Sequence, residues 1–236
     1  MRITIDNSFL KYSDFINKIP SMIDSGEGDV IYDKRNKIVR FSYDNRTFIV
    51  KKYKKVNFIQ QIAYSFFCKS KAERAFEYAE KYKQLGIATP QRIAYMEQKS
   101  MGMFSIGYFV CEESEGTECH LLLREVEDYD KNLAEMVTDH ILLMHSKGIL
   151  HGDLNLSNFL YADGHLTMID INRTQFRDGM PTDDECLNNM VRLTHRKDLY
   201  EYLIGSYARK RKWDVGNTVK IANKLLYKFE HRKFRL

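Results

Sequence analysis

Four polar side chains between positions 151 and 170 have the types and the spacing that phosphoryl transfer requires. His151, Asp153 and Asn158 lie on one short segment, and Asp170 follows Asn158 by 12 residues. The carboxylate of Asp153 can orient a hydroxyl group and take its proton, while the amide of Asn158 and the carboxylate of Asp170 suit Mg²⁺ on nucleotide phosphates. We therefore predict that Asp153 is a catalytic base and that the other two residues bind the Mg²⁺ of Mg-ATP. His151 is expected to brace the catalytic segment rather than to react.

The residues between Asn158 and Asp170 predict a short β-hairpin that would bring these two side chains together. Apolar runs at Phe159–Tyr161 and Leu166–Ile169 stand on either side of Asp163-Gly164, a pair that is common in tight turns. A hairpin of this length places the residues before and after it at the same end of a small sheet. The alternative is a turn rich in Asn and Asp that carries no chemistry.

Upstream, the sequence predicts an antiparallel meander that would present a lysine to the phosphates. Three β-rich runs, Val30–Tyr32, Lys37–Tyr43 and Thr47–Tyr53, are separated by turn-forming residues at 33–36 and 44–46. The first third of the chain is therefore expected to consist of strands.

Lys51 lies on the third of these runs, in Phe48-Ile49-Val50-Lys51, and is the candidate contact for the α- and β-phosphates of ATP. Because more lysines follow it directly, the alternative is a solvated side chain in a basic run. A helix predicted at Ala72–Leu85 carries Glu73 and Glu77 one turn apart on one face, and either can pair with the lysine. We favour Glu77, which lies deeper in the helix, and keep Glu73 as the alternative.

Contacts to the rest of the nucleotide are predicted from weaker signals. Gly26 and Gly28 precede the first strand and are the candidates for a loop that covers the phosphates, although a third glycine with the usual spacing is absent. The adenine is expected against the backbone near Val110 and Glu112, at the end of a later strand. ATP and Mg²⁺ are thus the predicted ligands of the site.

The order of these elements predicts an α+β fold with two lobes. A β-rich N-lobe with one main helix is expected at about residues 1–112, a polar connector at 113–118, and a reduced α-rich C-lobe at about 119–236. In the C-lobe, Leu133–Lys147 has apolar residues at helical spacing, and the chain after about residue 183 reads as mostly helical.

The chain resembles the protein-kinase-like fold and, within it, the lipopolysaccharide core kinases that phosphorylate 3-deoxy-octulosonic acid (Kdo) or heptose. The resemblance covers about Gly26 to Arg177. It is carried by Val50-Lys51, the helix that leads into Gly86–Pro90, the segment His151–Asn158 and the segment Ile169–Arg173. It implies an ATP-dependent kinase whose acceptor is a sugar hydroxyl of the core glycolipid, in the cytoplasm or peripheral on the inner membrane.

Departures from protein kinases favour an acceptor other than a protein. Asn155 stands where Ser/Thr protein kinases usually have lysine, Asp170 is followed by Ile-Asn rather than Phe-Gly, and no Ala-Pro-Glu follows. Only 66 residues remain after Asp170, too few for a full activation segment and a peptide-binding lobe. Two alternatives remain: a kinase of a soluble small molecule, similar to aminoglycoside or choline kinases, and a pseudokinase that acts as a binding module.

Two surfaces are candidates for contact with lipid. Val56–Cys68 has a broad apolar face flanked by lysines, which is typical of a helix on an anionic membrane surface, and the alternative is a helix packed on its own lobe. The segment Ser206–Leu236 holds ten Lys and Arg against two Asp and Glu. This basic segment is either a solvated helix surface or a contact for acidic glycolipid.

Charge and composition limit the other function classes. The net charge is +5, from 37 Lys and Arg and 32 Asp and Glu, and the basic C-terminal segment accounts for more than all of it, so we expect no nucleic-acid partner. The four cysteines form no Cys-X-X-Cys pair, the start of the chain has no leader-like apolar stretch, and no apolar run approaches about 18 residues. A cytoplasmic protein with reduced thiols is therefore expected.

Overall fold

The computed structural model describes residues 1–34 and 36–232. Arg35 of the first predicted turn and the last basic residues of the C-terminal segment, Lys233 and Arg235, lie outside the described residues. The chain divides into two compact units, Met1–Ser114 and Glu115–Leu236. No helix among the described residues is long and apolar enough to cross a membrane.

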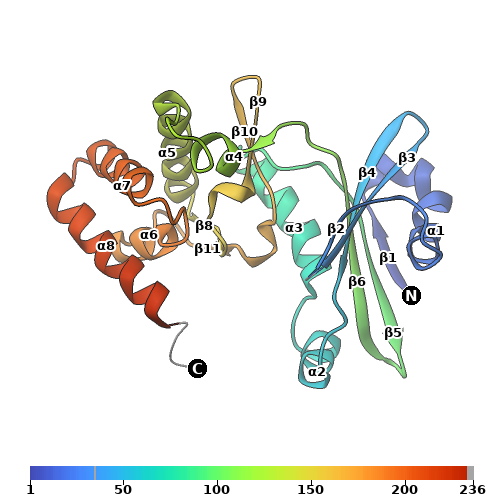
Figure 1. Cartoon of the computed structure of the whole chain (residues 1–236). Coiled ribbons are helices and arrows are strands. Elements are labelled where there is room, and N and C mark those ends of the chain that lie inside the picture. The colour runs from blue at the N-terminus through green and yellow to red at the C-terminus, as the bar shows by residue number, and fades with distance from the viewer. Residues whose placement is uncertain (35, 233–236) are drawn as a thin grey trace. The chain divides into compact units, whose positions relative to one another are not determined.

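A six-stranded antiparallel sheet forms the centre of the first unit, in the strand order β1-β5-β6-β4-β3-β2 (Figure 1). Its strands are β1 (Arg2–Ile5), β2 (Asp29–Asp33), β3 (Asn36–Tyr43), β4 (Arg46–Tyr53), β5 (Arg92–Ser100) and β6 (Met103–Glu112). The strands β2, β3 and β4 are neighbours joined by short turns, so the predicted meander is confirmed. In the second turn, Asp44 and Asn45 have φ angles of +50° and +55°, which a two-residue type I′ turn requires.

Helices cover both faces of this sheet. The 3-10 helix η1 (Asn7–Tyr12) and α1 (Ser13–Asp24) cover one face, and α3 (Lys71–Gln84) covers the other, while α2 (Phe58–Phe66) contacts β6. The prediction that the first third of the chain consists of strands is therefore wrong for residues 7–24.

The sequence does not predict α1, because Pro20 stands inside it and proline removes a helical hydrogen bond. The helix is stable in the fold since Ile16, Ile19 and Ile23 bury in one core with Phe48 of β4. Each buried side chain of this size contributes about 1.5–3 kcal/mol, so three of them exceed the roughly 3 kcal/mol that an interior proline costs.

Small residues allow α3 to lie close to the sheet. A Cβ on Gly107 of β6 would be 3.1 Å from the Cβ of Ala72, so the two backbones could not approach in this way with larger side chains. Ser70 caps the start of α3 by accepting the Glu73 N–H at 3.1 Å, and Gly86, with φ of +76°, ends it as predicted.

The second unit is mainly helical. Its helices are α4 (Cys119–Leu123), α5 (Lys131–Ser146), α6 (Asp183–Met190), α7 (Lys197–Arg211) and α8 (Val215–Arg232), with short 3-10 helices η2 (Leu156–Asn158) and η3 (Ile171–Arg173). The strands are β7 (Thr117–Glu118), β8 (Ile149–Leu150), β9 (Phe159–Ala162), β10 (His165–Met168) and β11 (Gln175–Phe176). The predicted helix near residues 133–147 is confirmed as α5, and the helical end of the chain as α6, α7 and α8.

The hairpin predicted between Asn158 and Asp170 is also confirmed. Phe159 of β9 pairs with Met168 of β10, so the residues just outside the hairpin meet at one end of it. Its turn consists of residues 163 and 164, with φ of +46° and +79°. A separate two-stranded sheet is formed by β8 and β11.

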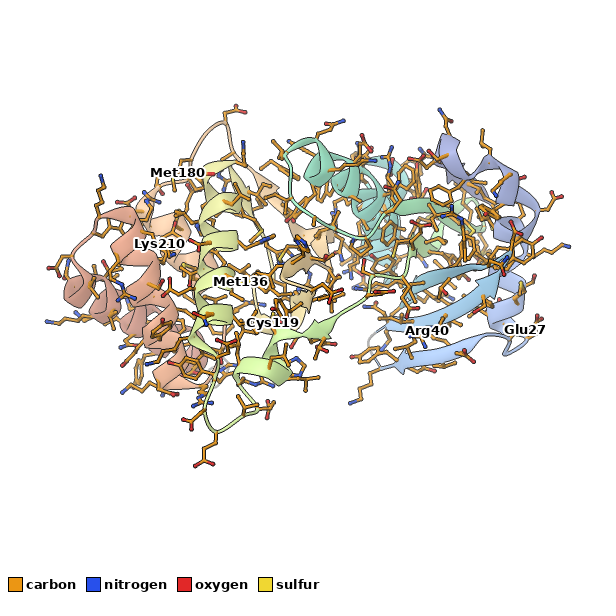
Figure 2. The ribbon with its side chains drawn as sticks, turned by 90° about the horizontal axis from the view of Figure 1, so that it is seen from above. Glu27, Arg40, Cys119, Met136, Met180 and Lys210 are labelled. Carbon is orange, nitrogen blue, oxygen red and sulfur yellow. The ribbon has the colours of Figure 1, made fainter. Side chains whose placement is uncertain are left out.

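Basic residues at the end of α7 bind acidic side chains of the same unit. The Nζ of Lys210 lies 2.7 Å from Asp139 and 3.0 Å from Glu135, both on α5, and Figure 2 shows this lysine beside α5. Arg211 pairs with Asp183 at 3.0 Å, on α6. This part of the basic C-terminal segment therefore balances acidic charge within its own unit.

Candidate active site

The segment from His151 to Asn158 joins β8 to β9 and is held by the imidazole of His151. This side chain is fully buried; its Nδ1 lies 3.2 Å from the Asp153 backbone nitrogen, and its Nε2 lies 3.1 Å from the backbone oxygen of Ile169. Because Nδ1 accepts from an N–H, Nε2 carries the proton and donates to Ile169. Burial lowers the pKa of His151, which agrees with a neutral ring. The imidazole thus links the segment to the residue before Asp170.

The side chain of Asn158 is oriented by a hydrogen bond to the backbone. Its Nδ2 donates to the Asp153 carbonyl oxygen at 2.7 Å, and Asn155 Nδ2 donates to the same oxygen at 3.1 Å. The carbonyl oxygen of Asn158 accepts from the Ile169 N–H at 3.0 Å, across the open end of the hairpin. With its nitrogen held by a carbonyl, Asn158 has Oδ1 as the side-chain atom that can meet a cation.

Asp170 has a left-handed backbone conformation, with φ of +57° and ψ of +41°, just before η3. For a residue with a Cβ this conformation costs roughly 1–2 kcal/mol, and such strain gathers at functional sites. Its Oδ1 accepts from Nδ2 of the buried Asn172 at 2.6 Å, which fixes the direction of the carboxylate. The negative charges of Asp170 and Asp153 both act to raise the pKa of His151, but the effect of burial is larger and the pKa is lowered.

Gly152 allows the segment from His151 to Asn158 to touch the turn that follows Asp170. A Cβ at this position would lie 2.2 Å from the carbonyl oxygen of Arg173, so a side chain does not fit without a backbone shift. The absence of a side chain at this one position is what lets the two loops meet.

Two arginines that sequence reasoning did not single out for a role reach the carboxylate of Asp153. Arg192 Nη1 lies 3.1 Å from Oδ1, and Arg173 Nη1 lies 3.9 Å from Oδ2. Arg173 has a local signal, because it follows the second acidic residue by three positions. Arg192 has no such signal in the sequence. It lies just after α6, and the fold brings it to the site because the neighbouring Leu193 oxygen accepts the Leu156 N–H at 3.1 Å.

In the first unit, Lys51 lies on β4 in register with Ile38 of β3 and Phe109 of β6. Its Nζ lies 5.7 Å from the centroid of the Tyr53 ring. Because side chains alternate along a strand, Lys51 and Tyr53 share the face that α3 covers, and Val50 lies on the α1 face.

Val110 and Glu112 are less suited to bind adenine than the sequence suggests. Val110 pairs with Val50 on one side and with β5 on the other, and its side chain lies in the core on the α1 face. The backbone N–H of Glu112 donates to the Gln91 oxygen at 2.9 Å, and its carboxylate pairs with Arg46. These groups therefore have partners within the sheet.

Glu77, which is predicted as the partner of Lys51, binds a lysine that lies just before α3. The carboxylate of Glu77 binds Nζ of Lys69 at 2.6 Å, and that of Glu73 lies 3.5 Å from Arg2 of β1. Of the two, Glu73 is the more buried, with 14% of its side chain exposed against 38% for Glu77.

Gly26 and Gly28 precede the end of β2 that is farther from Lys51 along the sheet. Gly28 has φ of +85°, and a Cβ there would be 2.6 Å from a methyl group of Val39, so tight packing explains this glycine. Along the sheet, Lys51 is level with Ile38, close to the turn that joins β2 and β3 rather than to the turn that precedes β2.

The residues present fit a magnesium ion that arrives with a nucleotide. No group of three or more His, Cys, Asp or Glu side chains able to hold a metal ion occurs in residues 1–34 and 36–232. Asn158 and Asp170 offer one amide oxygen and one carboxylate, and Mg²⁺ commonly takes one or two carboxylates and completes its shell with phosphate oxygens and water.

The chain is similar to known proteins in sequence pattern and in fold. A family model, described as the lipopolysaccharide kinase (Kdo/WaaP) family, matches residues 28–213. Among solved structures, the chain is similar to WaaP in complex with acyl carrier protein, with a TM-score of 0.61, 18% sequence identity and coverage of 98% of each chain. At this identity the likeness shows the fold alone. No curated protein sequence matches the chain.

Proposed function

Because the chain belongs to the lipopolysaccharide kinase (Kdo/WaaP) family, as the sequence motifs predict, we propose that it transfers the γ-phosphoryl group of ATP to a sugar hydroxyl of the lipopolysaccharide inner core, on Kdo or heptose. One observation carries the proposal within this family: the buried ring of His151 binds the backbones of Asp153 and of Ile169, which precedes Asp170, and the amide of Asn158 binds the Asp153 carbonyl oxygen, so one hydrogen-bond network links the three residues. A base and a pair of Mg²⁺ ligands in this arrangement are what phosphoryl transfer needs.

In the proposed reaction, Asp153 orients the acceptor hydroxyl and takes its proton as the new phosphate ester forms and ADP leaves. The backbone of Asp153 is held on both sides, since its N–H binds His151 and its carbonyl oxygen binds Asn155 and Asn158. Catalysis of this type depends mainly on positioning, which such a rigid backbone supplies. His151 acts through these hydrogen bonds and does not react.

Three residues are proposed to bind the nucleotide and its metal ion. Asn158 and Asp170 would hold Mg²⁺, which neutralises charge on the phosphates when it is bound. Lys51 is proposed to bind the phosphates from β4, where the register of the sheet fixes its backbone between β3 and β6.

An acceptor that is part of a lipid requires the enzyme to work at a membrane, and α2 offers a surface for this. Four apolar side chains of α2 and the residue after it are 64–80% exposed: Phe58, Ile59, Phe66 and Phe67. The inner side of the helix is fixed, because Ser65 Oγ accepts the Phe104 N–H at 2.9 Å. The outer side is apolar and has no buried residue.

The positive charge around α2 favours contact with an anionic membrane surface. Residues 54–69 contain three lysines and no Asp or Glu, and Lys54 and Lys55 are exposed. Each such lysine gains about 1 kcal/mol near an anionic lipid surface. We propose that the apolar side chains of α2 enter the anionic inner membrane while Lys54 and Lys55 contact its headgroups.

The proposed function is tested by transfer of labelled phosphate from ATP to purified core glycolipid. Asp153→Asn and Asp170→Asn should each lower kcat by about 10³-fold. Asp163→Asn is the matched control, because this aspartate is exposed in the hairpin turn and Asn tolerates its φ of +46°, so full activity is expected.

Three results would overturn the proposal. Undiminished turnover in the Asp153 or Asp170 variant would remove the mechanism. Phosphorylation of a soluble sugar or amino alcohol, with none of the glycolipid, would replace the acceptor class. Absence of any thermal stabilisation by Mg-ATP, together with absence of turnover, would leave a binding module.

A further inference from the structure

Two guanidinium groups meet the carboxylate that is proposed as the base. Arg192 lies 3.1 Å and Arg173 lies 3.9 Å from the two oxygens of Asp153. The arginine side chains are 43% and 42% exposed, against 28% for the aspartate. Each guanidinium has five N–H donors and the carboxylate cannot accept from all of them, so both arginines retain donors that face solvent.

Each arginine is held in place by a separate contact of the second unit. The backbone of Arg173 lies against Gly152, where a Cβ would be only 2.2 Å from its carbonyl oxygen. The guanidinium of Arg192 lies over the ring of Phe229 on α8, 4.8 Å from the centroid, a geometry that attracts the cation to the ring face. The last helix of the fold thus braces one of the two arginines.

The local charge favours an anionic acceptor. Asp153 alone would repel a substrate that carries a carboxylate or a phosphate near the reacting hydroxyl. With Arg173 and Arg192 beside it, the formal charge of the three side chains is +1 rather than −1. The planar fork of arginine also fits two oxygens of a carboxylate or a phosphate at once.

We infer that Arg173 and Arg192 form a subsite for an anionic group, a carboxylate or a phosphate, that neighbours the acceptor hydroxyl. The inference rests on the proposed function and deepens it, since it assigns two residues that select the acceptor. It also assigns a role to α8, because Phe229 on this helix would hold Arg192 toward the acceptor.

The test compares acceptors and variants in one set of kinetic measurements. Four glycolipid acceptors are used: one with free carboxylates, its methyl ester, and the dephosphorylated form of each. For the wild-type chain, masking the recognised anion should raise the KM for the acceptor about 10- to 100-fold, and whether esterification or dephosphorylation has this effect identifies the group.

The variants then assign the effect to the arginines. Arg192→Gln and Arg173→Gln should raise the acceptor KM to the value seen with the masked acceptor, and masking should then have little further effect. Arg192→Lys should recover part of the affinity, and Phe229→Leu should weaken it less than Arg192→Gln. Arg209→Gln is the control, because this exposed arginine pairs with Glu135 on α5 and should leave KM unchanged.

Two results would overturn the subsite. If the arginine variants increased turnover, the ion pairs would only restrain Asp153. If they lost equal activity on masked and unmasked acceptors, their role would be structural.

Equilibrium binding of the four glycolipids to the wild-type and Arg192→Gln chains, without ATP, separates this inference from the proposed function. Binding that depends on both the anion and Arg192 supports the subsite even if no phosphate is transferred. Binding that depends on neither rejects the subsite even if the chain is a kinase.

Discussion

The side-chain nitrogen of Asn158 lies 2.7 Å from the backbone oxygen of Asp153, so the proposed metal ligand and the proposed base hold each other in position. Asn155 donates to the same oxygen at 3.1 Å but contributes no atom to the proposed metal site. Both asparagines therefore brace the loop, but only Asn158 is also proposed to bind the cation.

Substitution of each asparagine should show this separation. Asn158→Ala removes both the brace and the metal ligand, and we expect kcat to fall about 10³-fold and the Mg²⁺ concentration for half-maximal rate to rise. Asn155→Ala should lower kcat about 10-fold, because it removes one of two hydrogen bonds to the oxygen, and should leave the Mg²⁺ dependence unchanged. Rates measured at increasing Mg²⁺ concentrations test this difference. An equal increase in the half-maximal Mg²⁺ concentration in both variants would contradict the assignment of Asn158 as the metal ligand.

The stability of the protein should fall in mild acid because of two histidines on α5. Burial lowers the pKa of His140 and of His145 to about 4, whereas the unfolded value is about 6.5. Below about pH 6.5 the unfolded chain binds more protons, so the free energy of unfolding decreases as the pH falls toward 4, by about 1.4 kcal/mol per pH unit for each histidine. Urea unfolding between pH 7 and pH 5 measures this slope, and a flat profile would contradict it.

Replacement of the same two histidines by leucine should have opposite effects at pH 7. The Nε2 atom of His140 is buried with no hydrogen-bond partner among the described residues, so His140→Leu should raise the free energy of unfolding by about 1 kcal/mol. His145 binds Tyr207 at 2.8 Å and Asn189 at 3.2 Å, so His145→Leu should lower it by about 2 kcal/mol. The same unfolding experiment compares them, and a loss of equal size in both would show that the imidazole of His140 is satisfied.

A methyl group at Gly152 should separate the catalytic segment from the turn after Asp170. Gly152→Ala places a Cβ 2.2 Å from the Arg173 oxygen, and we expect a loss of about 10²-fold in kcat because the backbone must move. Gly205→Ala, in α7, is the control: its Cβ would meet nothing closer than 3.6 Å, and alanine favours the helix by up to about 1 kcal/mol. Full activity of Gly152→Ala would mean that the two loops need not touch.

The proposed contact of α2 with lipid predicts a loss of vesicle binding on substitution. The double change Phe58→Ser and Phe67→Ser should raise the Kd for anionic vesicles at least about 10-fold, since each buried Phe contributes about 1.5–3 kcal/mol. Leu10→Ser, a change at an exposed residue of η1, should have no effect. Co-sedimentation measures binding, and activity on detergent-dispersed acceptor should be retained. Unchanged vesicle binding of the double variant would reject α2 as the lipid contact.

The local structure around the candidate site could be predicted from sequence because it depends on residue types at short spacing. The loop from His151 to Asn158 and the turn at Asp163-Gly164 are local patterns, and their conformations follow from neighbouring residues. The partner of a helix side chain is not local. Glu77 binds Lys69, which lies before the start of α3, and the helical periodicity gives no sign of this pair.

Long-range packing accounts for the rest of what the sequence did not predict. Arg192 reaches Asp153 across 39 residues, and only the placement of α6 and α8 brings it there. Val110 lies in the interior of the sheet because β1 and β5 extend the sheet beyond β6, and no pattern in the sequence shows that the start of the chain pairs with β5.

The coverage of the sheet on both faces has a consequence for hydrogen exchange. Four consecutive residues of β5, from Ile93 to Met96, are buried because α1 and α3 lie on opposite sides. Their amides, and those of β4 beside β6, should exchange with deuterium only when the whole unit opens, whereas α2, with no buried side chain, should exchange through local opening. The amides of β4, the strand that carries Lys51, should thus exchange slowly. Those of α2, which is proposed to contact lipid, should exchange faster because this helix can open locally.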